Sequence, residues 1–157
     1  MASAADRVRS LRTGRRLALA ALFEAEFGQR TADAILERSL AEIEADAGAA
    51  ALARGLVGDA TAHREEIDQL IERYAPQYPV VQLARMDRAL LRGAIGEVLH
   101  SPATPSRVAI AEWVELARTY SGEPMRRLLN GVVGRIAADT SRGRMEPLDH
   151  QPESVDG

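Results

Sequence analysis

Apolar residues recur at helical spacing along most of this chain, and no segment alternates apolar and polar residues as a strand does. The stretch "RRLLNGVVGRIA" (126–137) shows the period clearly, because Leu128, Val132 and Ile136 follow one another every four residues. Its central Asn-Gly pair is typical of a hairpin turn between strands. The flanking period predicts instead that the pair lies inside a helix, where glycine costs about 1 kcal/mol relative to alanine.

The same period predicts about six helices joined by short loops, and hence an all-α helical bundle. The first helix starts near Thr13, a suitable N-cap, and Gly28 ends it. Thr31 is the predicted cap of the second helix. The third is a single long helix that runs to Tyr74.

The segment "APQYPV" (75–80) contains two prolines and must interrupt the helical pattern. We expect it to divide the bundle into two three-helix subdomains, residues 12–75 and 80–138. Residues 1–11 are predicted to be a flexible, arginine-containing arm. Residues 139–157 are polar and aperiodic, and are predicted to be a disordered tail.

The composition limits the class of protein. Apolar residues make up 46% of the chain, which is enough for a buried core, and aromatic residues only 4%. The absence of cysteine excludes a disulfide framework and a thiolate metal site. No signal peptide or long apolar run is present, so we expect a cytoplasmic protein without a membrane partner.

Charge is unevenly distributed along the chain. All 20 basic residues are arginine, whose planar guanidinium can grip phosphate bidentately or stack on a base. Residues 1–23 hold five arginines and one acid, residues 24–72 four and twelve, residues 73–135 nine and five, and residues 136–157 two and five. The two basic segments can together form one positive face opposite a solvated acidic one.

Candidate catalytic and metal-binding groups are few. His63 and Glu66 lie three residues apart on one helical face, which is half of a metal site at most. The other histidines are His100 and His150, the latter in the predicted tail. An ordinary partly buried histidine beside an acid is the commoner meaning of such a pair. We therefore expect no enzyme, no metal and no cofactor.

Five arginines, Arg7, Arg9, Arg12, Arg15 and Arg16, lie within ten residues near the N-terminus. The last three share one face as the helix begins, at spacings of three and four. Cations at a helix N-terminus oppose the macrodipole, so this cluster is expected to meet an anion such as an RNA phosphate. The alternative, a merely solubilising tail, remains open.

In the second half of the chain, Arg127 and Asn130 lie near two aromatic residues, Trp113 and Tyr120. Bases of single-stranded RNA stack on such rings, although each ring taken alone is more often a core residue. Gly131 has two interpretations. Another helix approaches closely there, or the glycine leaves an exposed surface to which a nucleotide or a partner can come close.

Three segments resemble the bacterial transcription antitermination factor NusB family: "RTGRRLALAALFEAEF" (12–27), "MDRALLRGAIGEVLH" (86–100) and "TPSRVAIAEWVELARTYSGEPMRRLLNGVVGRIA" (104–137). The likeness spans residues 12–138. The third segment is the most specific, because its Glu112, Leu116–Ala117 and Asn130–Gly131 fall in order at the family's spacing.

The resemblance implies two three-helix subdomains and binding to the single-stranded boxA element of nascent ribosomal RNA leader transcripts. It also implies a heterodimer with NusE, a small-subunit ribosomal protein. That complex joins RNA polymerase and suppresses premature, Rho-dependent termination. Family members occur as monomers or as homodimers, so a homodimer remains open.

Family positions transfer to this chain residue by residue. The implied RNA-binding residues are Arg12, Arg15, Arg16, Phe23, Asp87, Arg127 and Asn130. The implied partner surface lies on the fourth and fifth predicted helices, with Arg88, Arg92, Glu112 and Tyr120.

The chain departs from the family pattern at several positions. Ala111 replaces an asparagine, Trp113 a small residue and Leu128 a phenylalanine, and Phe23 lacks the usual tyrosine hydroxyl. Pro124 stands where an acidic residue is common. These changes affect the expected details of base recognition rather than the expected fold.

Two other functions remain as alternatives. One is the NusB-like domain of an RNA cytosine methyltransferase, for which we expect no room after residue 138 for the catalytic domain. The other is a helical adaptor that binds only proteins. The salt dependence of RNA binding distinguishes the adaptor from the RNA-binding factor.

Overall fold

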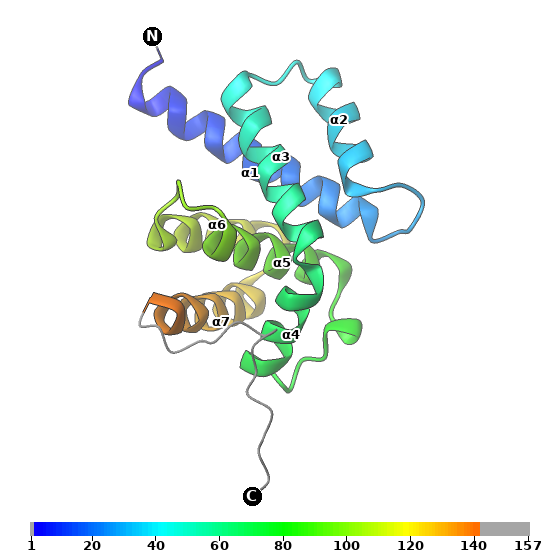
Figure 1. The fold of residues 1–157 in the computed structure, drawn as a ribbon, viewed down its shortest axis with the longest axis vertical. Helices are drawn as coiled ribbons and strands as arrows, with labels where there is room; N and C mark the ends of the chain where they lie inside the picture. The colour runs from blue at the N-terminus through cyan, green and yellow to red at the C-terminus, as the bar shows by residue number, and fades with distance from the viewer. Residues whose placement is uncertain (1, 142–157) are drawn as a thin grey trace, which may run out of the picture.

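The computed structural model of the chain describes residues 2–141, and in them it has helices and no strand (Figure 1), which confirms the all-α prediction. The elements in chain order are α1 (Ala4–Ala25), α2 (Ala32–Glu42), α3 (Ala47–Ala62), α4 (Arg64–Tyr74), the 3-10 helix η1 (Val80–Gln82), α5 (Arg85–His100), α6 (Ser106–Tyr120) and α7 (Glu123–Ser141). None of the helices in this range has the length and apolar character needed to span a membrane.

The helix α1 begins well before the predicted start at Thr13, so residues 4–11 are helical where a flexible arm was expected. Ser3 is the N-cap. Its side chain accepts a hydrogen bond from the Asp6 N–H, and the Asp6 carboxylate accepts one from the Ser3 N–H. This reciprocal capping box satisfies two otherwise unpaired amides. It also puts an acid in the first turn, where Asp6 pairs with Arg9 and offsets the repulsion among the arginines.

The predicted long third helix is two helices, α3 and α4, which meet at His63 (φ −110°, ψ 22°). Apolar positions continue through this bend, so the periodicity does not reveal it. α4 packs mainly against α5 and α7. The helices α1–α3 lie together in one half of the bundle and α5–α7 in the other (Figure 1), and α4 leads from the bend at His63 to the second half.

The helix α7 has the face that the opening period predicts, with Leu129, Val132, Val133 and Ile136 buried. It runs to Ser141, so the first three residues of the predicted tail are helical. The remainder of that tail, residues 142–157, lies outside the described residues.

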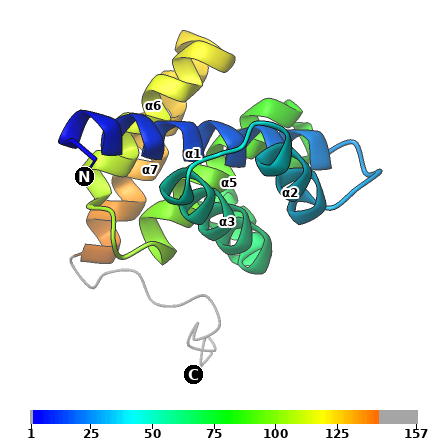
Figure 2. The same ribbon diagram turned by 90° about the horizontal axis from the view of Figure 1, so that it is seen from above.

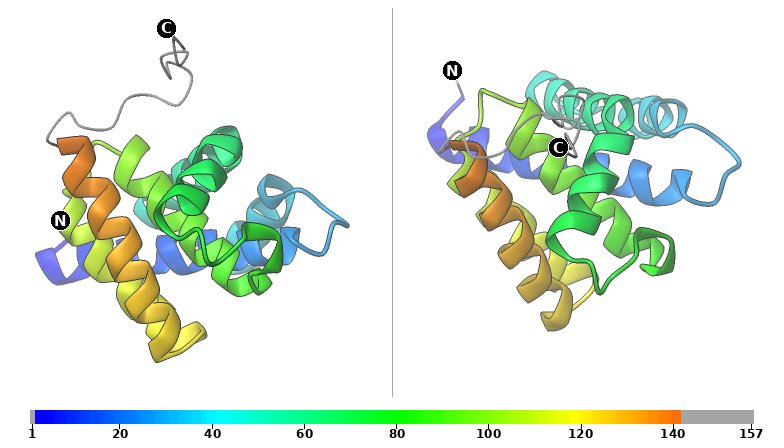
Figure 3. Two further views of the ribbon diagram at one scale, coloured as in Figure 1. Left: turned by 90° about the horizontal axis from the view of Figure 1, so that it is seen from below. Right: turned by 60° about the horizontal axis from the view of Figure 1, so that its bottom comes forward.

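One cluster of buried apolar side chains connects the two halves of the bundle. α1 spans the molecule, from α6 near its N-terminal end to α2 at its C-terminal end (Figure 2). It lies close to α3 at Gly14, where a Cβ would stand 2.8 Å from the Ala49 carbonyl oxygen. On the other side of the core, α7 packs along α6 (Figure 3). This arrangement leaves one side of α1 and one side of α6 bordering the same surface.

Candidate nucleic-acid interface

A groove of about 330 Å³ lies between α1 and α6 and gathers several residues predicted from the sequence. Its lining residues are Arg12, Arg15, Arg16, Glu112, Glu115, Leu116, Thr119 and Tyr120. The predicted RNA-binding arginines of α1 thus face two residues that the resemblance assigned to a partner surface, Glu112 and Tyr120. The two predicted surfaces meet in this groove.

Arg12 bridges the groove to α6. Its Nε lies 3.1 Å from Glu112 Oε2 and its Nη2 lies 3.2 Å from Glu112 Oε1, a two-pronged contact. The hydrogen bond and the charge of Glu112 raise the pKa of Arg12 above its ordinary value. Arg12 therefore stays charged while more than half of its side chain remains exposed.

Arg16 is the arginine of the groove whose guanidinium can still bind an anion. It is exposed and donates from Nη2 to Thr13 Oγ1 at 3.2 Å, and no carboxylate of residues 2–141 pairs with it. Tyr120, at the end of α6, is 47% exposed on the same groove. A guanidinium free to grip phosphate and a ring free to stack are the two groups that single-stranded nucleic acid needs.

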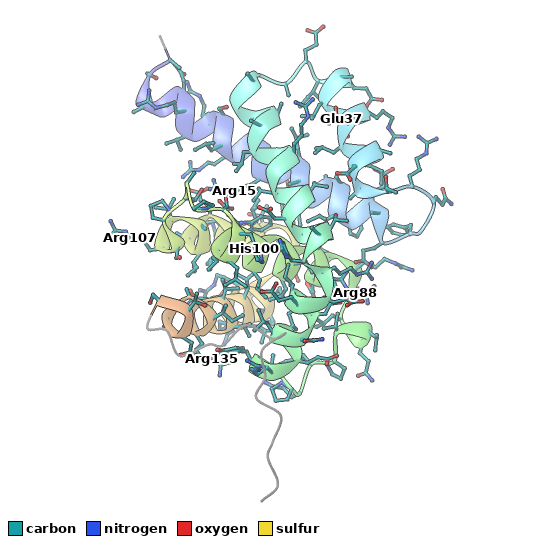
Figure 4. The ribbon with its side chains drawn as sticks, in the orientation of Figure 1. Arg15, Glu37, Arg88, His100, Arg107 and Arg135 are labelled. Atoms are coloured by element: carbon teal, nitrogen blue, oxygen red, sulfur yellow. The ribbon has the colours of Figure 1, made fainter. Side chains whose placement is uncertain are left out.

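Arg15 also borders the groove, but its guanidinium points into the protein, between α1 and α6 (Figure 4). It is 3% exposed and holds Glu97 of α5 through Nε–Oε1 (2.9 Å) and Nη2–Oε2 (2.7 Å) contacts. The indole N–H of Trp113 donates to the same Glu97 Oε1 at 2.7 Å. Both Arg15 and Trp113 are therefore core residues in this structure, with no face left for a base or a phosphate.

Two more predicted residues, Arg88 and Arg92, serve internal contacts. Arg92 is buried, with two hydrogen bonds to Asp68 (2.8 and 2.9 Å) and one to Glu26. Burial lowers the pKa of Arg92, but the hydrogen bonds and charges of these two acids outweigh it and raise that pKa overall. Arg88 pairs with Glu26 at 3.1 Å and donates to the Leu83 carbonyl. These arginines join α5 to the C-terminal end of α1 and to the middle of α4, which leaves Arg92 no surface for a partner.

Asp87 and Phe23 are two more predicted RNA-binding residues, and neither lines the α1–α6 groove. Asp87, at the start of α5, is half-buried and accepts a 2.6 Å hydrogen bond from the Ser121 hydroxyl. Phe23 is half-buried and meets Phe27 edge to face, with ring centroids 5.4 Å apart. Phe27 is 53% exposed, and the Arg85 guanidinium lies 4.6 Å from its ring centroid.

The pair of Phe27 and Arg85 is a potential stacking site that the sequence interpretation missed. The available signal was local. Phe27 directly precedes Gly28, which turns the chain at positive φ (79°) just after the end of α1. The neighbouring Arg85 is brought there only by the fold.

Arg127 and Asn130 are exposed on α7, away from the groove. Arg127 borders a separate hollow of about 420 Å³ that it shares with Gln77, Tyr78, Pro124 and Leu128. The exposed arginines among the predicted RNA-binding residues therefore occupy two surfaces: Arg12 and Arg16 the α1–α6 groove, and Arg127 this part of α7.

Gly131 decides between the two interpretations of the Asn-Gly pair. A Cβ built on Gly131 meets no atom within 4 Å, and the residue is exposed. Close approach of another helix is thus the wrong explanation. What remains is an open patch of bare backbone on α7, bounded by the exposed amide of Asn130.

Comparison with known proteins identifies the family. A family model described as the NusB family matches residues 12–138. The transcription antitermination protein NusB of Symbiobacterium thermophilum is 41% identical over 135 residues, which cover 81% of this chain and 88% of that protein. NusB of T. maritima has the same fold with a TM-score of 0.76 and 31% identity, over 85% of this chain and 96% of that one.

A structure of the antitermination factors NusB and NusE in complex with dsRNA matches with a TM-score of 0.74, over 83% of this chain and 97% of that one. Its 23% identity supports the fold alone. The family match over most of the chain and the sequence identity to whole NusB proteins agree with the helical bundle described above. The chain belongs to the NusB family.

Proposed function

We propose that this chain is a non-enzymatic, RNA-binding transcription antitermination factor. It binds the single-stranded boxA element of nascent ribosomal RNA leaders together with NusE, within the RNA polymerase antitermination complex, and suppresses Rho-dependent termination. The observation that carries the proposal is the α1–α6 groove, where Arg16 has no acidic partner in the described chain and Tyr120 is exposed beside it. The relatives' name, antitermination protein, supports the same function.

Within this proposal the residues have different roles. Arg12 and Arg16 bind phosphates, Tyr120 stacks on a base, and Asp87 contacts base edges next to the groove. Arg127 and Asn130 extend the RNA path over α7. Arg15 positions α1 against α5 instead of touching RNA, because its guanidinium is held by buried Glu97.

A second candidate function is a protein-only adaptor. It is favoured by the two acids of the groove, since Glu112 already neutralises Arg12 and Glu115 lies next to it. The methyltransferase-domain alternative receives less support, because the reported relative is an antitermination protein of which this chain covers most of the length.

The double variant Arg12→Ala/Arg16→Ala is expected to weaken RNA binding and leave the fold unchanged, because both side chains are exposed. Each lost phosphate contact should reduce the slope of log affinity against log salt by about 0.7. Fluorescence anisotropy of a labelled boxA-like RNA across a salt series measures both effects, and circular dichroism reports the fold.

The matched control is Arg38→Ala/Arg54→Ala. These arginines are also exposed and, like Arg12, pair with acids, Glu24 and Glu37, but they lie on α2 and α3. Their removal should leave the salt slope unchanged. Equal slopes for the wild type and the Arg12/Arg16 variant would contradict the role of the groove.

Gly131→Ala is expected to raise stability and weaken RNA binding at once. Alanine gains about 1 kcal/mol in a helix interior, and its Cβ meets open space. The same methyl group obstructs the close approach that we propose for the RNA, at an expected loss of about fivefold in affinity, equivalent to roughly 1 kcal/mol. Urea unfolding and anisotropy measure the two effects. Unchanged RNA affinity in a stabilised variant would remove Gly131 from the RNA path.

A further inference from the structure

Three side chains that can bind a metal converge where α3 meets α4 and α5 ends. His63 lies at the α3–α4 bend, Glu66 in the first turn of α4, and His100 at the end of α5, close to α3 in Figure 4. The two imidazole rings are stacked, with centroids 3.6 Å apart and planes within 10°. The sequence brings His63 and Glu66 together, and the fold adds the third group.

The edges of both rings face one carboxylate oxygen. Glu66 Oε2 is 3.6 Å from His63 Nδ1 and 3.5 Å from His100 Nε2. His100 Nε2 is buried from solvent and forms no hydrogen bond with any described residue. A buried polar atom without a hydrogen bond is uncommon and calls for a ligand or an explanation.

The spacing suits a tetrahedral metal ion. Ligand atoms about 2.0–2.1 Å from Zn²⁺ lie roughly 3.4 Å from one another, close to the separations of Glu66 Oε2 from His63 Nδ1 and from His100 Nε2. The three possible ligand atoms all lie within 4.8 Å of one another. Coordination requires the stacked rings to tilt apart, because each nitrogen lone pair lies in its ring plane.

The donor set indicates which class of ion would bind. Two imidazole nitrogens and one carboxylate are preferred by Zn²⁺ and its first-row neighbours, whereas Mg²⁺ and Ca²⁺ prefer oxygen ligands. A hollow of about 410 Å³, lined by residues 61–66, borders His63 and Glu66. It makes His63 and Glu66 accessible to an ion from solvent.

We propose that His63, Glu66 and His100 form a binding site for a divalent transition-metal ion, Zn²⁺ by donor preference. The ion links the α3–α4 bend to the end of α5. It binds the folded chain and not the unfolded one, so it stabilises the junction of the two halves. This revises the sequence-based expectation that the chain binds no metal.

Calorimetric titration of the full-length, chelator-treated chain with Zn²⁺ tests the site, with Co²⁺ absorption as a probe of tetrahedral coordination. We expect one ion per chain, a tetrahedral Co²⁺ spectrum and a higher unfolding temperature with Zn²⁺. His63→Gln and Glu66→Gln should each weaken binding by at least the roughly 10–100-fold that losing an outer-shell partner costs. His63 makes no side-chain capping hydrogen bond, so its variant should keep the fold.

The matched controls are Glu65→Gln, the adjacent exposed acid, and His150→Gln, the histidine that is not one of the three proposed ligands. Both should bind Zn²⁺ as the wild type does. The proposal is overturned by a wild-type chain that binds no stoichiometric Zn²⁺ at micromolar concentrations. It is equally overturned by affinity that survives in His63→Gln and Glu66→Gln, or that falls as far in the controls.

Discussion

Replacement of Arg15 by alanine is expected to lower the free energy of unfolding by about 3–5 kcal/mol, the cost of leaving one member of a buried ion pair without its partner. The Glu97 side chain is 0% exposed and Arg15 supplies its only cation among the described ion pairs. After the substitution, the carboxylate keeps only the Trp113 indole N–H. Urea denaturation followed by circular dichroism measures the loss.

Two further variants separate this explanation from a simple loss of packing. Arg54→Ala breaks an exposed ion pair with Glu37, and should cost no more than about 1 kcal/mol. Arg15→Met combined with Glu97→Gln removes both charges, and should recover much of the stability that Arg15→Ala loses. A loss below about 1 kcal/mol for Arg15→Ala would contradict the buried pair and return Arg15 to the list of RNA-binding candidates.

Gly93→Ala is expected to destabilise the chain by about 3 kcal/mol through overpacking. An added Cβ would stand 2.3 Å from Cη2 and 2.8 Å from Cζ3 of Trp113, which is fully buried. The ring cannot move away easily, because its N–H is held by Glu97. Urea unfolding measures the loss, and the emission of this sole tryptophan reports a displaced ring.

Gly131→Ala is the control for Gly93→Ala, since the same change on α7 meets open space and should stabilise. Combining Gly93→Ala with Trp113→Phe should cost less than the sum of the two single changes, because a smaller ring makes room for the methyl group. Wild-type stability and emission in Gly93→Ala would contradict the packing described here.

Much of the fold follows from local patterns in the sequence. The cap of α2 at Thr31 is confirmed, with its side chain accepting from the Ala34 N–H at 3.2 Å. The helical face of α7 is confirmed in spite of its Asn-Gly pair. The bend at His63 could not be predicted, because apolar spacing persists through it and only packing of α4 on α5 and α7 requires it.

The candidate site was less predictable, because it depends on contacts between distant residues. Helical spacing groups Arg12, Arg15 and Arg16 on one side of α1, but cannot tell which of them meets an acid 82 residues away. One signal was available: Glu97 lies in a long apolar stretch of α5, and a buried acid there requires a cation. The position of Trp113, which departs from the family pattern, also depends on a distant residue, because Gly93 leaves the space that its ring occupies.

The most direct test of the RNA-binding account is the affinity of the wild-type chain for a short single-stranded boxA-like RNA. Fluorescence anisotropy would compare it with a scrambled strand and a double-stranded form, each with and without NusE. We expect the tightest binding to the single-stranded boxA-like RNA, and tighter binding when NusE is added. Absence of binding to every RNA at low salt, with or without NusE, would contradict it and favour the protein-only adaptor.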